Sequence, residues 1–261
     1  MKRFLLFLTA LYSCLSAMPD YYEGKKVENI EVFDTRGSKH VAVKWIGDSK
    51  DENGPLIIAI NGGHGKWSLQ DSHITPSRVG VILAGMKNYR VLSLDMPDDE
   101  YMKGEAGGKG SEVYRLSRYQ IDDIKSVLSA VNKNGSPVYV LTTSKSTITG
   151  INAAGSDIPN LKGVILTAVS ADLSKLAPFA KVKTLWIHHK NDKCFNVGID
   201  AIKKVSLAAK NSVFVEVVNE ANVSGAECSM TNYHGFVGRD MDIAKTIDLW
   251  IDNKNFDTLI K

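Results

Sequence analysis

The fold is decided by the stretch VYVLTTSKST at residues 138–147. Its first four residues are apolar, which is typical of a strand covered on both faces of a sheet. Residues 148–154 then have a helix-compatible composition. A strand, a tight turn with a central serine, here Ser144, and a helix form the arrangement called a nucleophile elbow. Glycine is usual two residues before and after the serine, where this chain has Thr142 and Ser146. A Ser/Thr-rich turn that caps a helix is the alternative interpretation.

Similar apolar runs flank this stretch, and they lie at residues 56–60, 91–94, 164–166, 184–187 and 213–218. Apolar residues between the runs recur at helical spacing, as at Ile121, Ile124 and Leu128. Because strands and helices alternate, we expect an α/β fold with a mostly parallel, doubly wound sheet and helices on both faces. Two earlier runs, at 27–33 and 40–46, are separated by a turn at 34–37 and predict an antiparallel edge. The expected sheet has about eight strands.

One glycine-rich segment interrupts the alternation. Residues 97–111 contain four glycines and several charges, which predicts a surface loop.

Composition excludes some classes of function. The chain has 261 residues, of which 44% are hydrophobic and 23% are charged, and this is typical of one globular domain with a substantial core. The formal net charge is +3, and no run of five or more basic residues occurs. Electrostatics therefore offer no case for nucleic-acid binding.

The N-terminus has the features of a secretory signal. A basic start at Lys2 and Arg3 precedes an apolar run at 4–11, and small residues end at Ala17. We expect residues 1–17 to be a bacterial signal peptide and 18–261 to be one domain, periplasmic or secreted. The apolar run is too short to span a membrane, so stable membrane insertion is not expected. In a minority interpretation, residues 11–14 form a lipobox and Cys14 carries a lipid anchor.

Cysteine usage agrees with export. Cys14 lies in the signal, which leaves Cys194 and Cys228 as an even pair in an oxidising compartment. One disulfide is the economical interpretation, and two buried free thiols are the alternative.

Polar residues follow two later strands. Asp192 lies in the loop after the run at 184–187, and His234 follows the last strand after a long loop. The order Ser144, Asp192, His234 is the order of a catalytic triad on one type of α/β sheet. Taken singly, Asp192 is also a turn former and His234 a surface histidine.

A glycine-rich segment, NGGHG at 61–65, follows the strand at 56–60. Its backbone N–H groups at Gly63 and His64, with the N–H of Lys145 at a helix N-terminus, are candidate donors to a developing oxyanion. A plain glycine-rich turn is the alternative interpretation.

These segments together resemble the α/β-hydrolases over nearly the whole mature chain. More narrowly, they resemble uncharacterised exported bacterial hydrolases with a Gly-Thr-Ser-Arg-Gly-Thr elbow. The matching segments are Gly62-Gly63, the DMPDD run at 95–99, the elbow at 142–147, the HHKNDKC run at 188–194, and Cys228 followed by the HGF run at 234–236. The elbow departs from that pattern at Thr142, Lys145 and Ser146.

The resemblance implies an exported serine hydrolase that acts on a small-molecule ester, amide or thioester through an acyl-enzyme. Ser144 would be the nucleophile, His234 the base and Asp192 the orienting acid. A non-catalytic binding protein on the same scaffold and an acyltransferase with the same triad are the alternatives. Only about sixteen residues, 168–183, occupy the place where many relatives insert a cap domain, so a cap is expected to be minimal or absent. We expect no cofactor and no metal, since His188 and His189 are adjacent in a strand and face opposite ways.

Overall fold

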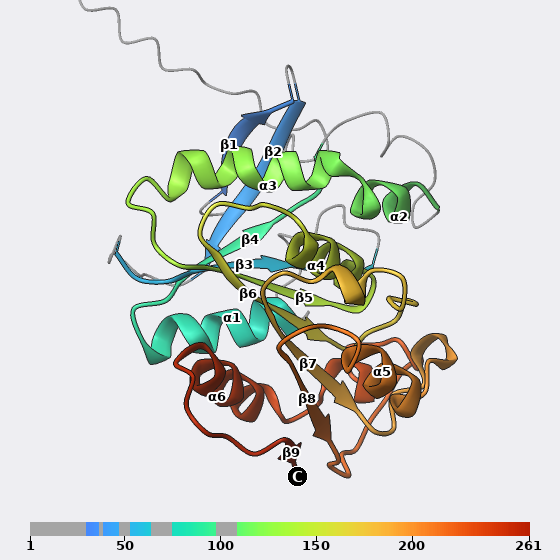
Figure 1. Ribbon diagram of the computed structural model, residues 1–261. Helices are drawn as coiled ribbons and strands as arrows, with labels where there is room; N and C mark the ends of the chain where they lie inside the picture. The colour runs from blue at the N-terminus through green and yellow to red at the C-terminus, as the bar shows by residue number, and fades with distance from the viewer. Residues whose placement is uncertain (1–29, 37–38, 47–52, 64–74, 98–108) are drawn as a thin grey trace, which may run out of the picture.

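The computed structural model describes residues 30–36, 39–46, 53–63, 75–97 and 109–261. It contains one nine-stranded sheet in the order β1-β2-β4-β3-β5-β6-β7-β8-β9 (Figure 1). The strands are β1 Ile30–Thr35, β2 Lys39–Ile46, β3 Leu56–Ile60, β4 Arg90–Leu94, β5 Val138–Thr143, β6 Leu161–Thr167, β7 Lys183–His189, β8 Ser212–Val217 and β9 Leu259–Ile260. The helices are α1 Thr75–Met86, α2 Lys109–Leu116, α3 Arg118–Val131, α4 Thr147–Gly155, α5 Ile199–Ser206 and α6 Asp240–Ile251.

The sheet is parallel except at one edge. β1 pairs with β2 and β2 with β4 in antiparallel fashion, as the two early runs predict. Every other neighbouring pair is parallel. The central strands β3, β4 and β5 are buried along their whole length, which explains why their sequences are continuous apolar runs.

Helices cover both faces of the sheet, and alternate residues of each strand pack against opposite layers (Figure 1). On β3, Ile58 belongs to the core cluster that contains Ile124 of α3 and Ile151 of α4. Its neighbour Ile57 belongs to the other cluster, with α1 and α6. The predicted doubly wound fold is confirmed.

Some predicted boundaries are wrong. β1 continues through Asp34 and Thr35, where a turn was expected, because Thr35 and Arg36 both hydrogen-bond the buried Asp123 of α3. α2 begins at Lys109, inside the segment predicted to be a loop. The ninth strand is two residues long and pairs with β8, so its sequence carries no pattern of its own.

Other predictions lie outside the described residues: the signal peptide at 1–17, Cys14, His64 and most of the loop at 97–111. Among the described helices, none is both long enough and apolar enough to cross a bilayer.

The carboxyl ends of β5, β6, β7 and β8 point to the same edge of the sheet, which is where sites form in open α/β folds. The connection from β6 to β7 holds only the short 3₁₀ turn Ala177–Phe179, which agrees with the expectation of a minimal or absent cap at this position.

Candidate active site

Ser144 lies on a strained turn between β5 and α4. β5 ends at Thr143, a 3₁₀ turn spans Ser144–Ser146, and α4 begins at Thr147. The φ of Ser144 is 53°, in the left-handed region that residues other than glycine rarely adopt. Ser144 is only 7% exposed. A strand, a strained turn at a serine and a helix are the backbone arrangement that a nucleophile elbow requires.

The two elbow positions that lack glycine are accommodated by specific contacts. The Ser146 hydroxyl accepts a hydrogen bond from the Thr143 N–H and lies 2.7 Å from the carbonyl oxygen of Ile60, so it ties the elbow to β3. The Thr142 hydroxyl donates to the carbonyl of Ile165. Gly150 leaves the space that Thr142 fills, because a Cβ at Gly150 would lie 2.7 Å from Thr142 Oγ1.

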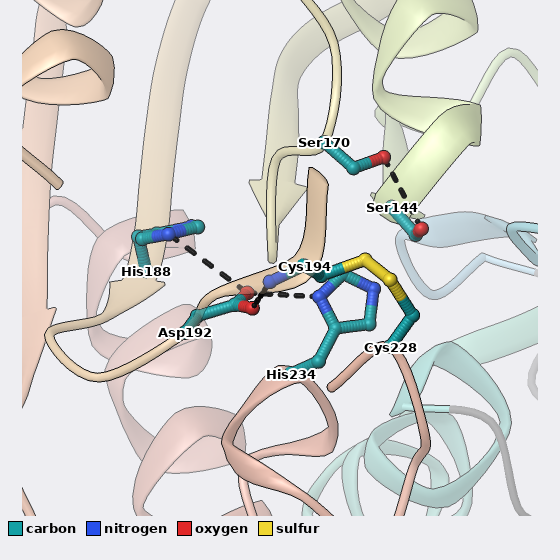
Figure 2. Close-up of a disulfide and its surroundings, with 7 residues drawn as sticks. All are labelled: Ser144, Ser170, His188, Asp192, Cys194, Cys228 and His234. Atoms are coloured by element: carbon teal, nitrogen blue, oxygen red, sulfur yellow. Dashed lines mark hydrogen bonds and ion pairs between the residues drawn. A yellow bond between two sulfur atoms is a disulfide. The ribbon is translucent and has the colours of Figure 1, made fainter. Parts of the chain in front are cut away.

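Ser170 is a site residue that the sequence did not reveal. Its Oγ lies 3.2 Å from Ser144 Oγ (Figure 2). It follows β6 by three residues, and Ala168 between them also has a positive φ, 47°. A single serine after a strand carries no pattern, so only the fold brings this hydroxyl to Ser144.

Asp192 and His234 form a buried pair. Nδ1 of His234 lies 2.8 Å from Oδ2 of Asp192, and both side chains are 1% exposed. The other carboxylate oxygen accepts the N–H of Cys194 at 2.9 Å. An ionised carboxylate only accepts hydrogen bonds, so Nδ1 of His234 is the donor of the pair, and in the neutral ring Nε2 is then the acceptor. Figure 2 shows the opposite edge of the ring turned toward the side on which Ser144 lies.

The structure does not join Ser144 to this pair directly. Among the described residues, Ser144 Oγ has Ser170 as its side-chain partner and no hydrogen bond to His234. Hydrogen bonds of this kind are often long before substrate binds.

His189 holds the two loops that carry Asp192 and His234. Its Nδ1 accepts the N–H of Asn191, and its Nε2 therefore donates to Asn219. Its ring stacks on Tyr233 with centroids 4.4 Å apart. The loops that carry Asp192 and His234 are thus both contacted by one imidazole that takes no part in the pair.

Gly235, next to His234, is required by a close backbone approach. A Cβ there would lie 2.0 Å from the carbonyl oxygen of Met230. The Gly235 carbonyl accepts from Arg78 of α1, which also pairs with Asp240 of α6. The turn that carries His234 is therefore anchored to both helices on that face.

His188 is the second imidazole near Asp192. Its Nε2 lies 3.8 Å from Asp192 Oδ2, a distance compatible with an ion pair. Burial, however, lowers the pKa of His188 to about 4, and the charge of Asp192 only partly opposes this shift. His188 is therefore neutral near pH 7, and neither ring nitrogen has a hydrogen-bond partner among the described residues.

The expected disulfide is present between Cys194 and Cys228. Cys194 is buried next to the Asp192 loop, and Cys228 is exposed on the segment that leads to His234. Figure 2 shows the bridge beside the imidazole of His234. It closes a loop of 34 residues and connects the acid loop to the base loop.

The glycine segment after β3 packs directly on the elbow. A Cβ at Gly62 would lie 2.7 Å from Ser144 Cβ, so only glycine fits there. Gly63 has a φ of +64° and open space where its Cβ would be. Gly62 is thus next to the serine, Gly63 is the residue that follows it, and His64 lies outside the described residues.

Arg115 of α2 places a buried cation behind this segment. Its side chain is fully buried, and Nη2 donates to the carbonyl of Asn61 at 3.4 Å. Burial lowers the pKa of Arg115 to about 10, so it remains charged at neutral pH. Sequence patterning did not identify it, because its helix begins inside the predicted loop.

Lys145 has protein neighbours as well as solvent. Its Nζ lies 3.7 Å from Glu112 Oε1 and 5.7 Å from the ring centroid of Phe195, whose side chain is exposed. Phe195 itself has a φ of 58°, directly after Cys194.

The described residues hold no group of three or more histidines, cysteines or carboxylates placed to bind a metal ion.

The sequence matches no family model and no curated protein. Solved structures are similar in fold. An esterase from Rhodococcus sp. ECU1013 superposes with a TM-score of 0.60 at 11% identity, covering 87% of this chain and 100% of the other. The enol-lactonase from Burkholderia xenovorans LB400 gives 0.57 at 13% identity, with 85% and 100% covered. A proline iminopeptidase from Mycobacterium smegmatis gives 0.63 at 8% identity, with 86% and 98% covered.

These neighbours superpose over 85–87% of this chain. At such identities the likeness concerns the backbone alone. This chain has the α/β-hydrolase fold.

Proposed function

We propose that this protein is a serine hydrolase that cleaves a small ester, or a related amide or thioester, through an acyl-enzyme. One observation carries the proposal: the buried Asp192–His234 hydrogen bond at 2.8 Å lies at the same sheet edge as a serine with a strained, left-handed backbone. Esterase and lactonase structures among the fold neighbours are compatible with this chemistry.

In the proposed reaction, Ser144 Oγ attacks the carbonyl carbon and Nε2 of His234 takes its proton. Asp192 holds the ring with Nδ1 toward it and stabilises the imidazolium that forms. His234 then gives the proton to the departing alcohol, which leaves the acyl group on Ser144. Water, activated by the same imidazole, releases the acid and restores the serine.

The oxyanion would be held by backbone N–H groups of Gly63 and Lys145, with His64 as a further candidate. Lys145 lies directly after Ser144 at the start of the turn that leads into α4. The buried charge of Arg115 adds positive potential behind the glycine segment, where low dielectric strengthens its effect. The protein would need no cofactor for this reaction.

We also propose that the protein is exported to the periplasm or secreted. The support is the signal-like N-terminus and the disulfide, which persists in oxidising compartments. N-terminal sequencing of the protein purified from a bacterial periplasm or culture medium tests it, and the expected first residue is Met18. A mature chain that begins at Cys14 would favour the lipid anchor.

A non-catalytic binding protein is the second candidate. The observation in its favour is the contact of Ser144 with Ser170, which leaves the serine unpaired with His234.

Two measurements decide between the candidates. A fluorophosphonate probe should label wild type but not Ser144→Ala. Wild type should hydrolyse members of a panel of short acyl esters, and Ser144→Ala should do so about 10⁶-fold more slowly. His234→Ala should be nearly as damaging, and the double variant hardly worse, because triad members act as a unit. Ser156→Ala, at the end of α4, serves as the matched control and should retain full activity. A wild-type protein that neither labels nor hydrolyses any ester would support the binding protein.

A further inference from the structure

A cavity of about 140 Å³ lies between α5, β7 and the segment that follows β6. α5 packs against β7 and β8 at this side of the sheet (Figure 1). The walls are mostly apolar, and the principal residues are Val169, Leu173, Trp186, Val197, Ile202 and Val205.

The chemistry of the walls favours an uncharged apolar occupant. The indole N–H of Trp186 already donates to Thr184, so the ring offers the cavity only an apolar face. The one charged residue of the lining is Asp172, which is exposed. Hydrogen bonds from the Ser174 side chain and backbone lower the pKa of Asp172, which keeps it ionised at neutral pH. A carboxylate ligand would be repelled there.

The size of the cavity limits the occupant further. A buried apolar cavity of about 150 Å³ in another protein stays dry and binds benzene. The cavity here therefore suits a group of roughly that size.

The cavity adjoins the candidate active site through one short segment. Val169 and Ala171 line the cavity, and Ser170 between them contacts the Ser144 hydroxyl. On the opposite wall, Val197 directly follows the turn Cys194–Asn196, which begins two residues after Asp192. Consecutive Cα atoms are about 3.8 Å apart, so the cavity wall begins within one residue of the group that touches Ser144.

We infer that this cavity binds one small, uncharged apolar arm of the substrate, of about the size of a phenyl ring. The inference rests on the proposed hydrolase function. It names the substrate class: a compact ester in which the acyl or the alcohol part carries such a group.

Binding is tested first without turnover. Benzyl alcohol is titrated into the Ser144→Ala protein while tryptophan fluorescence is recorded. The chain has four tryptophans, so a Trp186→Phe variant identifies the signal from the cavity. We expect a saturable change that this variant loses. Phenylacetate should bind at least fivefold more weakly than benzyl alcohol, and Asp172→Asn should reduce that difference. No saturable change at Trp186 overturns the inference, whether or not esters are cleaved.

Substrate choice is tested by filling the cavity. Ala201 lines its mouth on α5, and Ala201→Phe should occupy it, whereas Ala208→Phe makes the same change at an exposed residue outside the lining. With wild type, ethyl phenylacetate or benzyl acetate should be preferred to ethyl acetate. Ala201→Phe should raise KM for the preferred ester at least tenfold and leave ethyl acetate within twofold, and Ala208→Phe should change neither.

The outcomes separate the two proposals. Selectivity that Ala201→Phe leaves unchanged overturns the assignment of the cavity to the substrate arm. If benzyl alcohol binds at Trp186 but wild type cleaves no ester, the hydrolase proposal fails, and with it the assignment to a substrate arm, while the cavity stands as a ligand site.

Discussion

The Ser144 hydroxyl lies 3.2 Å from that of Ser170, and this contact has a consequence for reactivity. If Ser144 is the nucleophile, its hydroxyl must turn to His234 before attack, and a bond made only in the resting state raises the barrier. One net hydrogen bond is worth about 1 kcal/mol, or roughly fivefold in rate. On the proposed mechanism, Ser170 therefore restrains the nucleophile.

We therefore predict that Ser170→Ala increases the rate of fluorophosphonate labelling of Ser144 about fivefold. Ser170→Thr retains the hydroxyl and should label at close to the wild-type rate. A fall in the labelling rate of Ser170→Ala would contradict the prediction, because it would mean that Ser170 assists the attack.

At the scale of the element, the turn at Ser144 tolerates Thr142 because the space for its side chain is provided by α4. Thr142 occupies a position where glycine is usual, and Gly150 of α4 makes room for it. A Cβ at Gly150 would also lie 2.6 Å from Leu166 Cδ2 on β6. A glycine is thus present eight residues after Thr142, in the first turn of α4, the helix that packs over the same strands.

Gly150→Ala is expected to destabilise the protein by about 1–3 kcal/mol, the usual cost of overpacking a core. Adding Thr142→Ala should recover part of this loss and not all of it, because the contact with Leu166 remains. Gly85→Ala in α1 is the control: its Cβ meets nothing within 4 Å, so it should stabilise the helix by about 0.5–1 kcal/mol. Urea unfolding measures all three variants, and equal effects at Gly150 and Gly85 would refute the packing argument.

The Cys194–Cys228 bridge joins the loop that carries Asp192 to the segment that leads to His234, and it should act on stability and on the alignment of this pair. For a closed loop of 34 residues the chain-entropy model gives about 3.8 kcal/mol, and measured values are often smaller. Because Cys194 donates its N–H to Asp192, movement of this loop also shifts the carboxylate that orients His234.

We predict that the double variant Cys194→Ala, Cys228→Ala turns over ester more slowly than wild type at temperatures where both proteins are folded. Circular dichroism at the assay temperature provides the control for folding. Turnover that stays at the wild-type level until the variant melts would show that the bridge only stabilises a surface loop.

For the whole molecule, the sequence predicts what depends on local pattern. Continuous apolar runs located the central strands, and the residues at their ends identified Ser144, Asp192 and His234 as candidates. Contacts between distant segments could not be predicted in this way. Ser170 contacts Ser144 because β6 and β5, which they follow, are neighbours in the sheet. Gly150 provides the space for Thr142, and β1 extends because Thr35 and Arg36 reach Asp123 on α3.

The burial of His188 makes the stability of the whole protein depend on pH. Its pKa is about 4 in the folded protein because burial disfavours the charged imidazole, whereas the ordinary value is 6.5. Below pH 6.5 the unfolded chain therefore binds a proton that the folded protein does not. Stability is lost as the pH falls from about 6.5 to about 4, and the loss is on the order of 3 kcal/mol. Burial lowers the pKa of His189 as well, which acts in the same direction.

We predict that His188→Phe removes most of this loss. Neither ring nitrogen of His188 has a hydrogen-bond partner among the described residues, so an apolar ring should be tolerated near pH 7.5. Urea unfolding at several pH values between 7.5 and 4 should give a shallower decline for the variant than for wild type. Asp157→Asn serves as the control variant. Hydrogen bonding to Lys181 lowers the pKa of this exposed carboxylate, so its protonation changes stability only below about pH 4. The variant should therefore show the same decline in stability between pH 7.5 and 4 as wild type. Parallel declines for His188→Phe and wild type would mean that other groups take up the protons.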